Sequence, residues 1–83
     1  MLSFLSKTPQ SIMTELKERC KARRKVLSYT QQELAIRSGV SLGSLKRFEQ
    51  SGQISLESLL RIAFVLECLD DFENFCEIQQ DNI

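Results

Sequence analysis

The 83 residues are enough for one small domain, near the lower end of what a single hydrophobic core stabilises. Hydrophobic residues make up 42% of the chain and charged residues 27%, a composition typical of soluble globular proteins. The longest apolar run, at 62–66, is too short to span a membrane, and residues 1–5 lack the basic start and long apolar core of a signal peptide. We therefore expect a cytoplasmic protein without a membrane-spanning segment.

The sequence contains none of the motifs that common catalytic and metal-binding sites use. There is no histidine, and Cys20, Cys68 and Cys76 are not at metal-ligand spacing. We expect these cysteines to be small buried hydrophobic residues, with a reactive thiol or an intermolecular disulfide as the alternative. Because a nucleophile elbow and a phosphate-binding loop are also missing, we expect no enzyme, no cofactor and no metal site.

The net charge of zero hides a strong segregation of charge along the chain. Ten Lys and Arg residues and only three acids lie from Lys7 to Arg47, which gives this part a charge of +7. From Phe48 onward, one cation, Arg61, faces eight acids, which gives −7. This pattern favours a basic end that attracts a polyanion, although two solvated faces of opposite sign would give the same counts.

Apolar residues recur at helical spacing, and no period-two run is long enough for a strand. The sequence therefore predicts an all-α fold with one domain over residues 9–78. Residues 1–8 are expected to be a flexible segment and residues 79–83 a frayed end. The five predicted helices cover residues 10–27, 31–37, 42–50, 56–68 and 71–78.

Capping signals mark the start of each of the first four predicted helices. Thr8 precedes the first, with Pro9 at its first position, and Thr30 forms a capping box with Glu33 at the second. Ser41 and Ser55 are the expected caps of the third and fourth helices. Glycines are expected to end the second and third helices, at Gly39 and Gly52. The inward stripe of the first helix is predicted to be Ile12, Leu16, Cys20 and Leu27.

The segment 31–49 has the pattern of two short helices that cross at a steep angle through a tight turn. Such a pair needs a small residue on the inner side of the first helix and a residue tolerant of positive φ at the turn, which Ala35 and Gly39 supply. At 100° per residue, Lys46 and Arg47 fall on the outer arc of the third helix and Glu49 beside its inner arc. The apolar residues expected to lock the pair are Leu34, Val40, Leu45 and Phe48.

Over roughly residues 12–69 the chain resembles the lambda-repressor-like (XRE-family) helix-turn-helix domain. The resemblance is carried by Arg24, Thr30, Gln31, Leu34, Ala35, Gly39, Val40, Ser41, Leu45, Phe48, Glu49, Leu56, Leu59, Leu60, Ala63 and Leu66. It implies that the predicted helices 31–37 and 42–50 form the helix-turn-helix and that the latter is the recognition helix. It also implies that Gln31 contacts a DNA phosphate and braces this helix, and that Arg24 and Glu49 form an internal ion pair.

Two residues depart from the family pattern. Ser38 stands where the family usually has an apolar residue, which is tolerable if its hydroxyl bonds back to a carbonyl. Gly43 stands where a side chain often reads a base. Either the backbone approaches DNA closely at Gly43, or base readout rests on fewer residues than usual.

The predicted function is sequence-specific binding of double-stranded DNA by a small, repressor-like transcriptional regulator. Arg47 is the first candidate for direct readout of a guanine, and Lys46 could read a base or contact phosphate. The full predicted DNA-binding set is Gln31, Ser41, Leu42, Gly43, Ser44, Lys46, Arg47 and Gln50. Phosphate contacts are expected from Lys21, Arg23, Lys25 and Arg37.

The C-terminal part leaves two questions open. An apolar stripe of Ile62, Val65, Leu69, Phe72 and Phe75 can form a homodimer interface, or it can be hidden by the fifth helix folding onto the fourth. The resemblance also implies a second function, that of an antitoxin or adaptor whose acidic, aromatic C-terminal part binds a partner protein.

Overall fold

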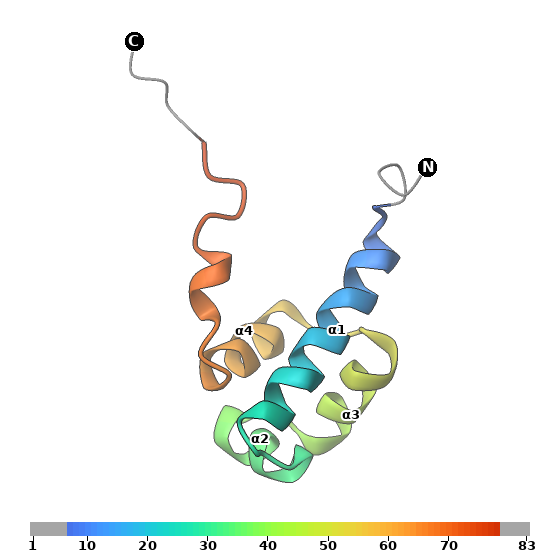
Figure 1. The fold of residues 1–83 in the computed structure, drawn as a ribbon, viewed down its shortest axis with the longest axis vertical. Coiled ribbons are helices and arrows are strands. Elements are labelled where there is room, and N and C mark those ends of the chain that lie inside the picture. The colour runs from blue at the N-terminus through green and yellow to red at the C-terminus, as the bar shows by residue number, and fades with distance from the viewer. Residues whose placement is uncertain (1–6, 79–83) are drawn as a thin grey trace.

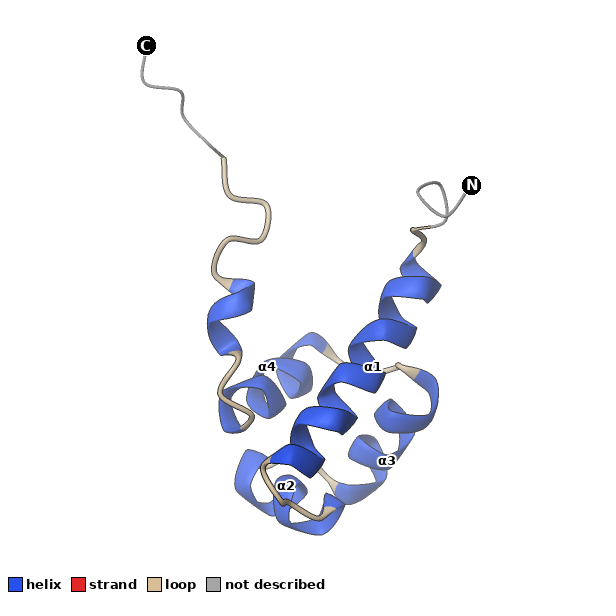
Figure 2. Cartoon of the chain, in the orientation of Figure 1, coloured by secondary structure: helices blue, strands red, loops and turns tan. Residues whose placement is uncertain are grey.

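The computed structural model describes residues 7–78 and is all-helical over that range (Figures 1 and 2). Four α-helices, α1 (Pro9–Val26), α2 (Gln31–Ser38), α3 (Leu42–Ser51) and α4 (Leu56–Val65), are followed by a short 3-10 helix, η2 (Leu69–Phe72). The expectations for residues 1–6 and 79–83 lie outside the described residues.

The first four helices begin where the capping signals predict. Thr8, Thr30, Ser41 and Ser55 each accept a hydrogen bond from the backbone N–H three residues on, which satisfies a donor left free at a helix start. Gly39 and Gly52 end α2 and α3 in the left-handed conformation, with φ of 74° and 82°. The bounds of the first three helices therefore agree with the sequence prediction to within one residue.

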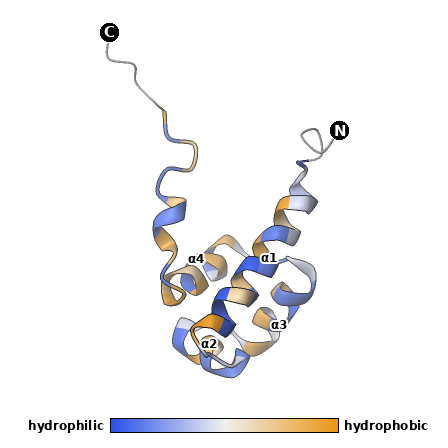
Figure 3. Ribbon diagram, viewed as in Figure 1, coloured by the Kyte–Doolittle hydropathy of each residue, from blue (hydrophilic) through white to orange (hydrophobic). Residues whose placement is uncertain are grey.

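The hydrophobic core lies where α2, α3 and α4 meet. Helix α2 packs on both α3 and α4, while α1 lies across α3 (Figure 1). Hydrophobic and hydrophilic residues alternate along the helices, as expected of amphipathic helices (Figure 3). The buried hydrophobic residues are Leu34, Ala35, Val40, Leu45, Phe48, Ile62, Ala63 and Leu66.

Helix α1 contributes less to the core than its predicted stripe suggests. Ile12, Leu16, Cys20 and Leu27 are all half-buried, and Arg24 is the one fully buried residue of the helix. The helix therefore covers the core with partly exposed apolar side chains and adds a charged group to the interior.

The predicted end of the fourth helix at residue 68 is wrong, because α4 stops at Val65. Arg23 of α1 donates from Nε to the carbonyl of Leu66 at 2.8 Å and from Nη2 to the carbonyl of Glu67 at 3.2 Å. Glu67 has a φ of 63°, a conformation that ends an α-helix. The side chain of Arg23 thus binds the carbonyl of Leu66, the residue that follows the last residue of α4 and lies 43 residues later in the chain.

The predicted fifth helix over 71–78 is also wrong. The chain forms η2 over Leu69–Phe72, without a side-chain cap, and then turns that lead away from the helices (Figure 1). Short helices are marginal in water unless an apolar face packs against the protein, and no residue from Leu69 to Ile78 is buried. The acidic, aromatic segment therefore lacks the packing that would hold it helical.

Candidate nucleic-acid interface

The turn between α2 and α3 fixes where α3 begins. Gly39 closes α2 with its N–H bonded to the carbonyl of Ala35, Val40 is buried beneath the turn, and Ser41 caps α3. Ser38, the unusual residue before this glycine, donates its hydroxyl to the carbonyl of Ala35 and accepts from the N–H of Val40, each at 3.3 Å. The buried hydroxyl is thus satisfied locally, and the connection between the helices is short and well bonded.

The inner side of α3 is anchored in the core. Leu45 and Phe48 are each 1% exposed and belong to the same hydrophobic cluster as Leu34, Ile62 and Leu66. Burying a leucine and a phenylalanine so completely strongly opposes rotation of the helix about its axis, because rotation would expose both. The direction of every outward side chain on α3 follows from this packing.

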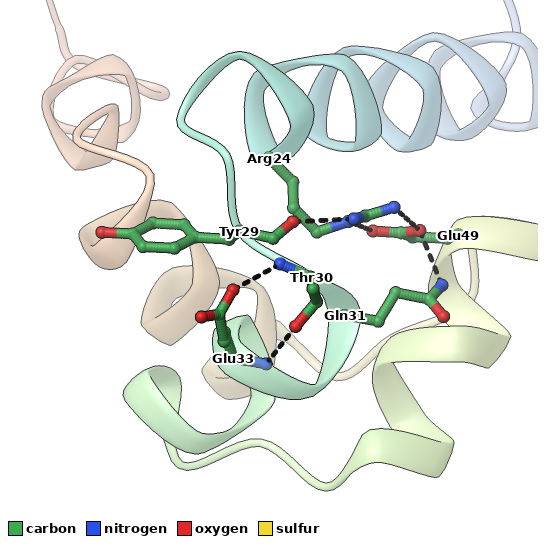
Figure 4. Close-up of polar contacts among 6 residues, drawn as sticks. All are labelled: Arg24, Tyr29, Thr30, Gln31, Glu33 and Glu49. Carbon is green, nitrogen blue, oxygen red and sulfur yellow. Dashed lines mark hydrogen bonds and ion pairs between the residues drawn. The ribbon is translucent and has the colours of Figure 1, made fainter.

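A buried polar network ties α3 to α1 and α2 (Figure 4). Arg24 donates from Nε to Glu49 Oε2 at 2.8 Å and from Nη2 to Glu49 Oε1 at 3.1 Å, so the expected ion pair is present in a two-bond geometry. Gln31 donates from Nε2 to the same Oε1 at 2.9 Å, and Arg24 Nη1 donates to the carbonyl of Tyr29. Both buried charges are therefore paired and hydrogen-bonded.

This network links the side chain of Gln31, at the start of α2, to Glu49 of α3. Its amide nitrogen is turned toward Glu49 on α3, and the residue is half-buried (Figure 4). The expected bracing contact to α3 is present, while a contact to a phosphate stays a prediction.

The outer side of α3 presents polar and basic groups. Lys46 and Arg47 are exposed, and within residues 7–78 no ion pair engages either of them. The acid of α3, Glu49, is buried and neutralised by Arg24. The α3 outer face, as we call this surface, is therefore positively charged. Its exposed residues are Ser41, Gly43, Ser44, Lys46, Arg47 and Gln50, with half-buried Leu42 at its edge.

Arg47 is held in place by a residue that the sequence analysis missed. Its Nη2 donates to Gln53 Oε1 at 2.8 Å. Gln53 follows the glycine that ends α3, so no helical periodicity links the two positions. The contact leaves other N–H donors of the guanidinium free, since an arginine has five.

Gly43 has no role in the packing of the described chain. A Cβ atom built there would meet no atom within 4 Å, and the residue does not adopt a positive φ. Glycine in a helix nevertheless costs about 0.5–1 kcal/mol relative to alanine. Neither sterics nor backbone conformation within the fold accounts for glycine at this position.

The four cations expected to contact phosphate divide into two groups. Arg23 binds the carbonyls at the end of α4, and the guanidinium of Arg37 lies 4.9 Å from the centre of the Tyr29 ring. Both therefore have roles in the fold that the sequence analysis missed. Lys21 is half-buried and Lys25 exposed, and no ion pair among the described residues engages them. Lys17 also has an unforeseen role, since its Nζ binds the carbonyl of Gln50 at 2.7 Å.

The predicted dimer stripe loses one of its five residues. Ile62 is fully buried in the core, so its assignment to an interface is wrong. Val65, Leu69 and Phe72 are half-buried, and Phe75 is 81% exposed. Because the fifth helix is absent, it does not cover these side chains either.

The cysteines differ in their surroundings. Cys20 and Cys68 are half-buried, whereas Cys76 is exposed, so its predicted burial is wrong. Burial, followed by the nearby Cys68 and Glu49, raises the pKa of the Cys20 thiol to about 11. In residues 7–78 no group of three metal-ligating side chains comes together.

No helix in the described part of the chain has the length and apolar character needed to cross a membrane. Comparison with protein-family models, curated proteins and solved structures gives no match to this chain.

Proposed function

We propose that the protein binds double-stranded DNA in a sequence-specific manner and acts as a small, repressor-like transcriptional regulator. In this proposal α2 and α3 are a helix-turn-helix, and α3 enters the major groove. One observation carries it: Lys46 and Arg47 project from a helix whose opposite side is locked in the core by Leu45 and Phe48.

The dimensions and chemistry of the α3 outer face suit a DNA groove. The major groove of B-DNA is about 12 Å wide and admits one α-helix. The planar guanidinium of Arg47 matches the O6 and N7 atoms of guanine, and its bond to Gln53 restricts its motion before binding. Lys46 supplies a base or phosphate contact, Leu42 an apolar contact to a thymine methyl, and Ser44 a hydroxyl.

Within residues 7–78, the acidic segment after α4 does not cover this surface. Asp70, Asp71, Glu73 and Glu77 are exposed on η2 and the segment after it, which lies apart from α3 in Figure 1. The acids of η2 and of the segment after it therefore lie apart from the α3 outer face, although Asp71 lies near Arg19 and Arg23 of α1. A polyanion approaching α3 meets positive charge first.

Selection of bound sequences from random DNA duplexes tests the proposal. We expect one sequence family to be enriched and Arg47→Ala to weaken binding to it by about 1–3 kcal/mol. Affinity for the selected site is expected to fall steeply with salt concentration. The matched control is Arg19→Ala, which also removes an exposed arginine, but on α1 and outside the α3 outer face.

We expect Arg19→Ala to leave the sequence preference unchanged. Enrichment of no sequence, or equal affinity of wild type and Arg47→Ala for the selected site, would contradict the proposal.

The second candidate function, binding of a partner protein as an antitoxin or adaptor, is favoured by the exposed C-terminal segment. Phe75 and Ile78 are 81% and 83% exposed and lie among the acidic residues. A truncation after Phe72 tests this function separately. It should abolish binding of a toxin encoded by a neighbouring gene while leaving DNA binding intact. Toxin binding that survives the truncation would argue against this function.

A further inference from the structure

One side of α4 is apolar and uncovered. Leu56 and Phe64 are 67% and 69% exposed, and Leu60 between them is half-buried. The three residues are four positions apart, so they follow one another along the same side of the helix. They line an open groove of about 720 Å³ between α2 and α4, which Leu69 borders at one end.

The three apolar side chains of α4 adjoin one another and form one continuous apolar stretch. A single exposed leucine requires no explanation, but a contiguous apolar patch marks an interaction site. This patch is distinct from the α3 outer face, because it is formed by α4 and the end of α2. Its use therefore does not compete with the residues proposed to contact DNA.

The charges beside the patch indicate what binds there. Glu57 and Arg61 lie next to the apolar residues and pair with each other at 2.9 Å, while both stay largely exposed. The patch therefore combines an apolar centre with one charge of each sign. A surface of this kind is complementary to itself, as a two-fold symmetric interface requires. The α3 outer face, in contrast, would repel its own copy.

We propose that this α4 face, defined by Leu56, Glu57, Leu60, Arg61 and Phe64, binds the same face of a second copy of the chain. With the two α4 helices antiparallel and Leu60 near the two-fold axis, Leu56 approaches Phe64 of the partner subunit. Glu57 comes within reach of Arg61 of the partner subunit. Each acid then has a cation in its own chain and in the other.

The size of the patch predicts a weak dimer. Stable complexes bury about 800 Å² on each partner, more than five side chains of one helix face supply. Pairing should therefore depend on protein concentration. If the proposed function holds, one duplex that binds both copies raises their effective concentration and strengthens the pairing.

Sedimentation equilibrium of the full chain without DNA, over a range from micromolar to millimolar concentration, tests the dimer. The mass of the wild type should rise toward that of two chains. Phe64→Glu should raise the dimer dissociation constant by about tenfold or more, because it places a charge in the apolar centre. The matched control is Phe75→Glu, since Phe75 is also largely exposed, at 81% against 69% for Phe64, but lies beyond η2. Thermal unfolding of both variants shows whether they are folded.

A charge exchange tests the antiparallel arrangement. Glu57→Arg should weaken the dimer several-fold because it opposes two like charges, and adding Arg61→Glu should restore it. A chain that stays monomeric at every concentration overturns the proposal, and so does a dimer lost in Phe75→Glu but kept in Phe64→Glu. Because DNA is absent, these results are independent of whether α3 binds DNA.

Discussion

The two sides of the ten-residue helix α3 differ in how far contacts within the fold explain their residues. On the inner side, Leu45, Phe48 and Glu49 are buried, and each has partners on other helices. On the outer side, Lys46 and Gly43 contact nothing that explains their identity. The fold therefore accounts for the residues on the inner side, and it does not account for Gly43 and Lys46 on the outer side.

The largest effect should come from removing a charge on the inner side. Glu49→Ala leaves Arg24 buried without its carboxylate and Gln31 without its acceptor. Breaking a buried ion pair in this way costs about 3–5 kcal/mol. For a small domain this is much of the total stability, so we expect a large drop in the midpoint of urea or thermal unfolding.

The exposed pair on α1 provides the control for this prediction. Glu15→Ala breaks the ion pair between Glu15 and Arg19, whose side chains are 47% and 72% exposed, respectively. It should change the free energy of unfolding by less than about 1 kcal/mol. Equal unfolding midpoints for Glu49→Ala and Glu15→Ala would show that the buried network does not stabilise the fold.

Local sequence predicted the features that local interactions decide. The caps at Thr30 and Ser41, and the burial of Leu45 and Phe48, follow from hydrogen bonds and periodicity within a few residues. These features place the α3 outer face, whose exposed residues agree with the angular prediction. The all-helical class, the first three helices and the position of the α3 outer face were therefore predictable from the sequence.

Features that depend on contacts between residues far apart in the sequence could not be predicted. The end of α4 depends on Arg23, and the position of Arg47 depends on Gln53 beyond the end of its helix. Ile62 was assigned to the wrong side of α4, where seven of the ten residues are apolar and lie on more than one side of the helix. The same ambiguity hid the α4 face, which only the exposed fractions of Leu56 and Phe64 show.

A smaller effect of opposite sign is expected on the outer side. Gly43→Ala should stabilise the protein by about 0.5–1 kcal/mol, because the added methyl meets nothing and alanine favours the helix. If DNA approaches the backbone at this point, the same variant should bind the selected site more weakly. Thermal unfolding and titration of labelled duplex measure the two effects on one sample.

Gly52→Ala is the matched control for this prediction. Gly52 has a φ of 82°, and a Cβ there would lie 3.1 Å from Met13, so this variant should be destabilised. Loss of stability in Gly43→Ala as well would mean that the outer side is constrained by the fold after all.

The contrast between groups that the fold holds and groups that it leaves free extends to the cysteines, where the expected effect near neutral pH is smallest. Cys76 is exposed, while burial raises the pKa of Cys20 above its ordinary value of 9.0 to about 11. At pH 8 only about one Cys20 thiol in a thousand is then ionised, and the thiolate is the reactive form. Iodoacetamide should therefore modify Cys76 first, and mass spectrometry should show the slower reaction of Cys20 accelerating as the pH rises.

The same shift has a consequence for stability with a definite sign. The unfolded chain loses the Cys20 proton near pH 9, whereas the folded chain holds it to about pH 11, so this contribution to stability is complete below pH 9 and is lost between pH 9 and 11. Cys20→Ala should remove that part of the pH dependence of unfolding and leave the rest. Two results would contradict a raised pKa of Cys20: an unchanged pH dependence of unfolding in Cys20→Ala, or modification of Cys20 as fast as that of Cys76 at pH 8.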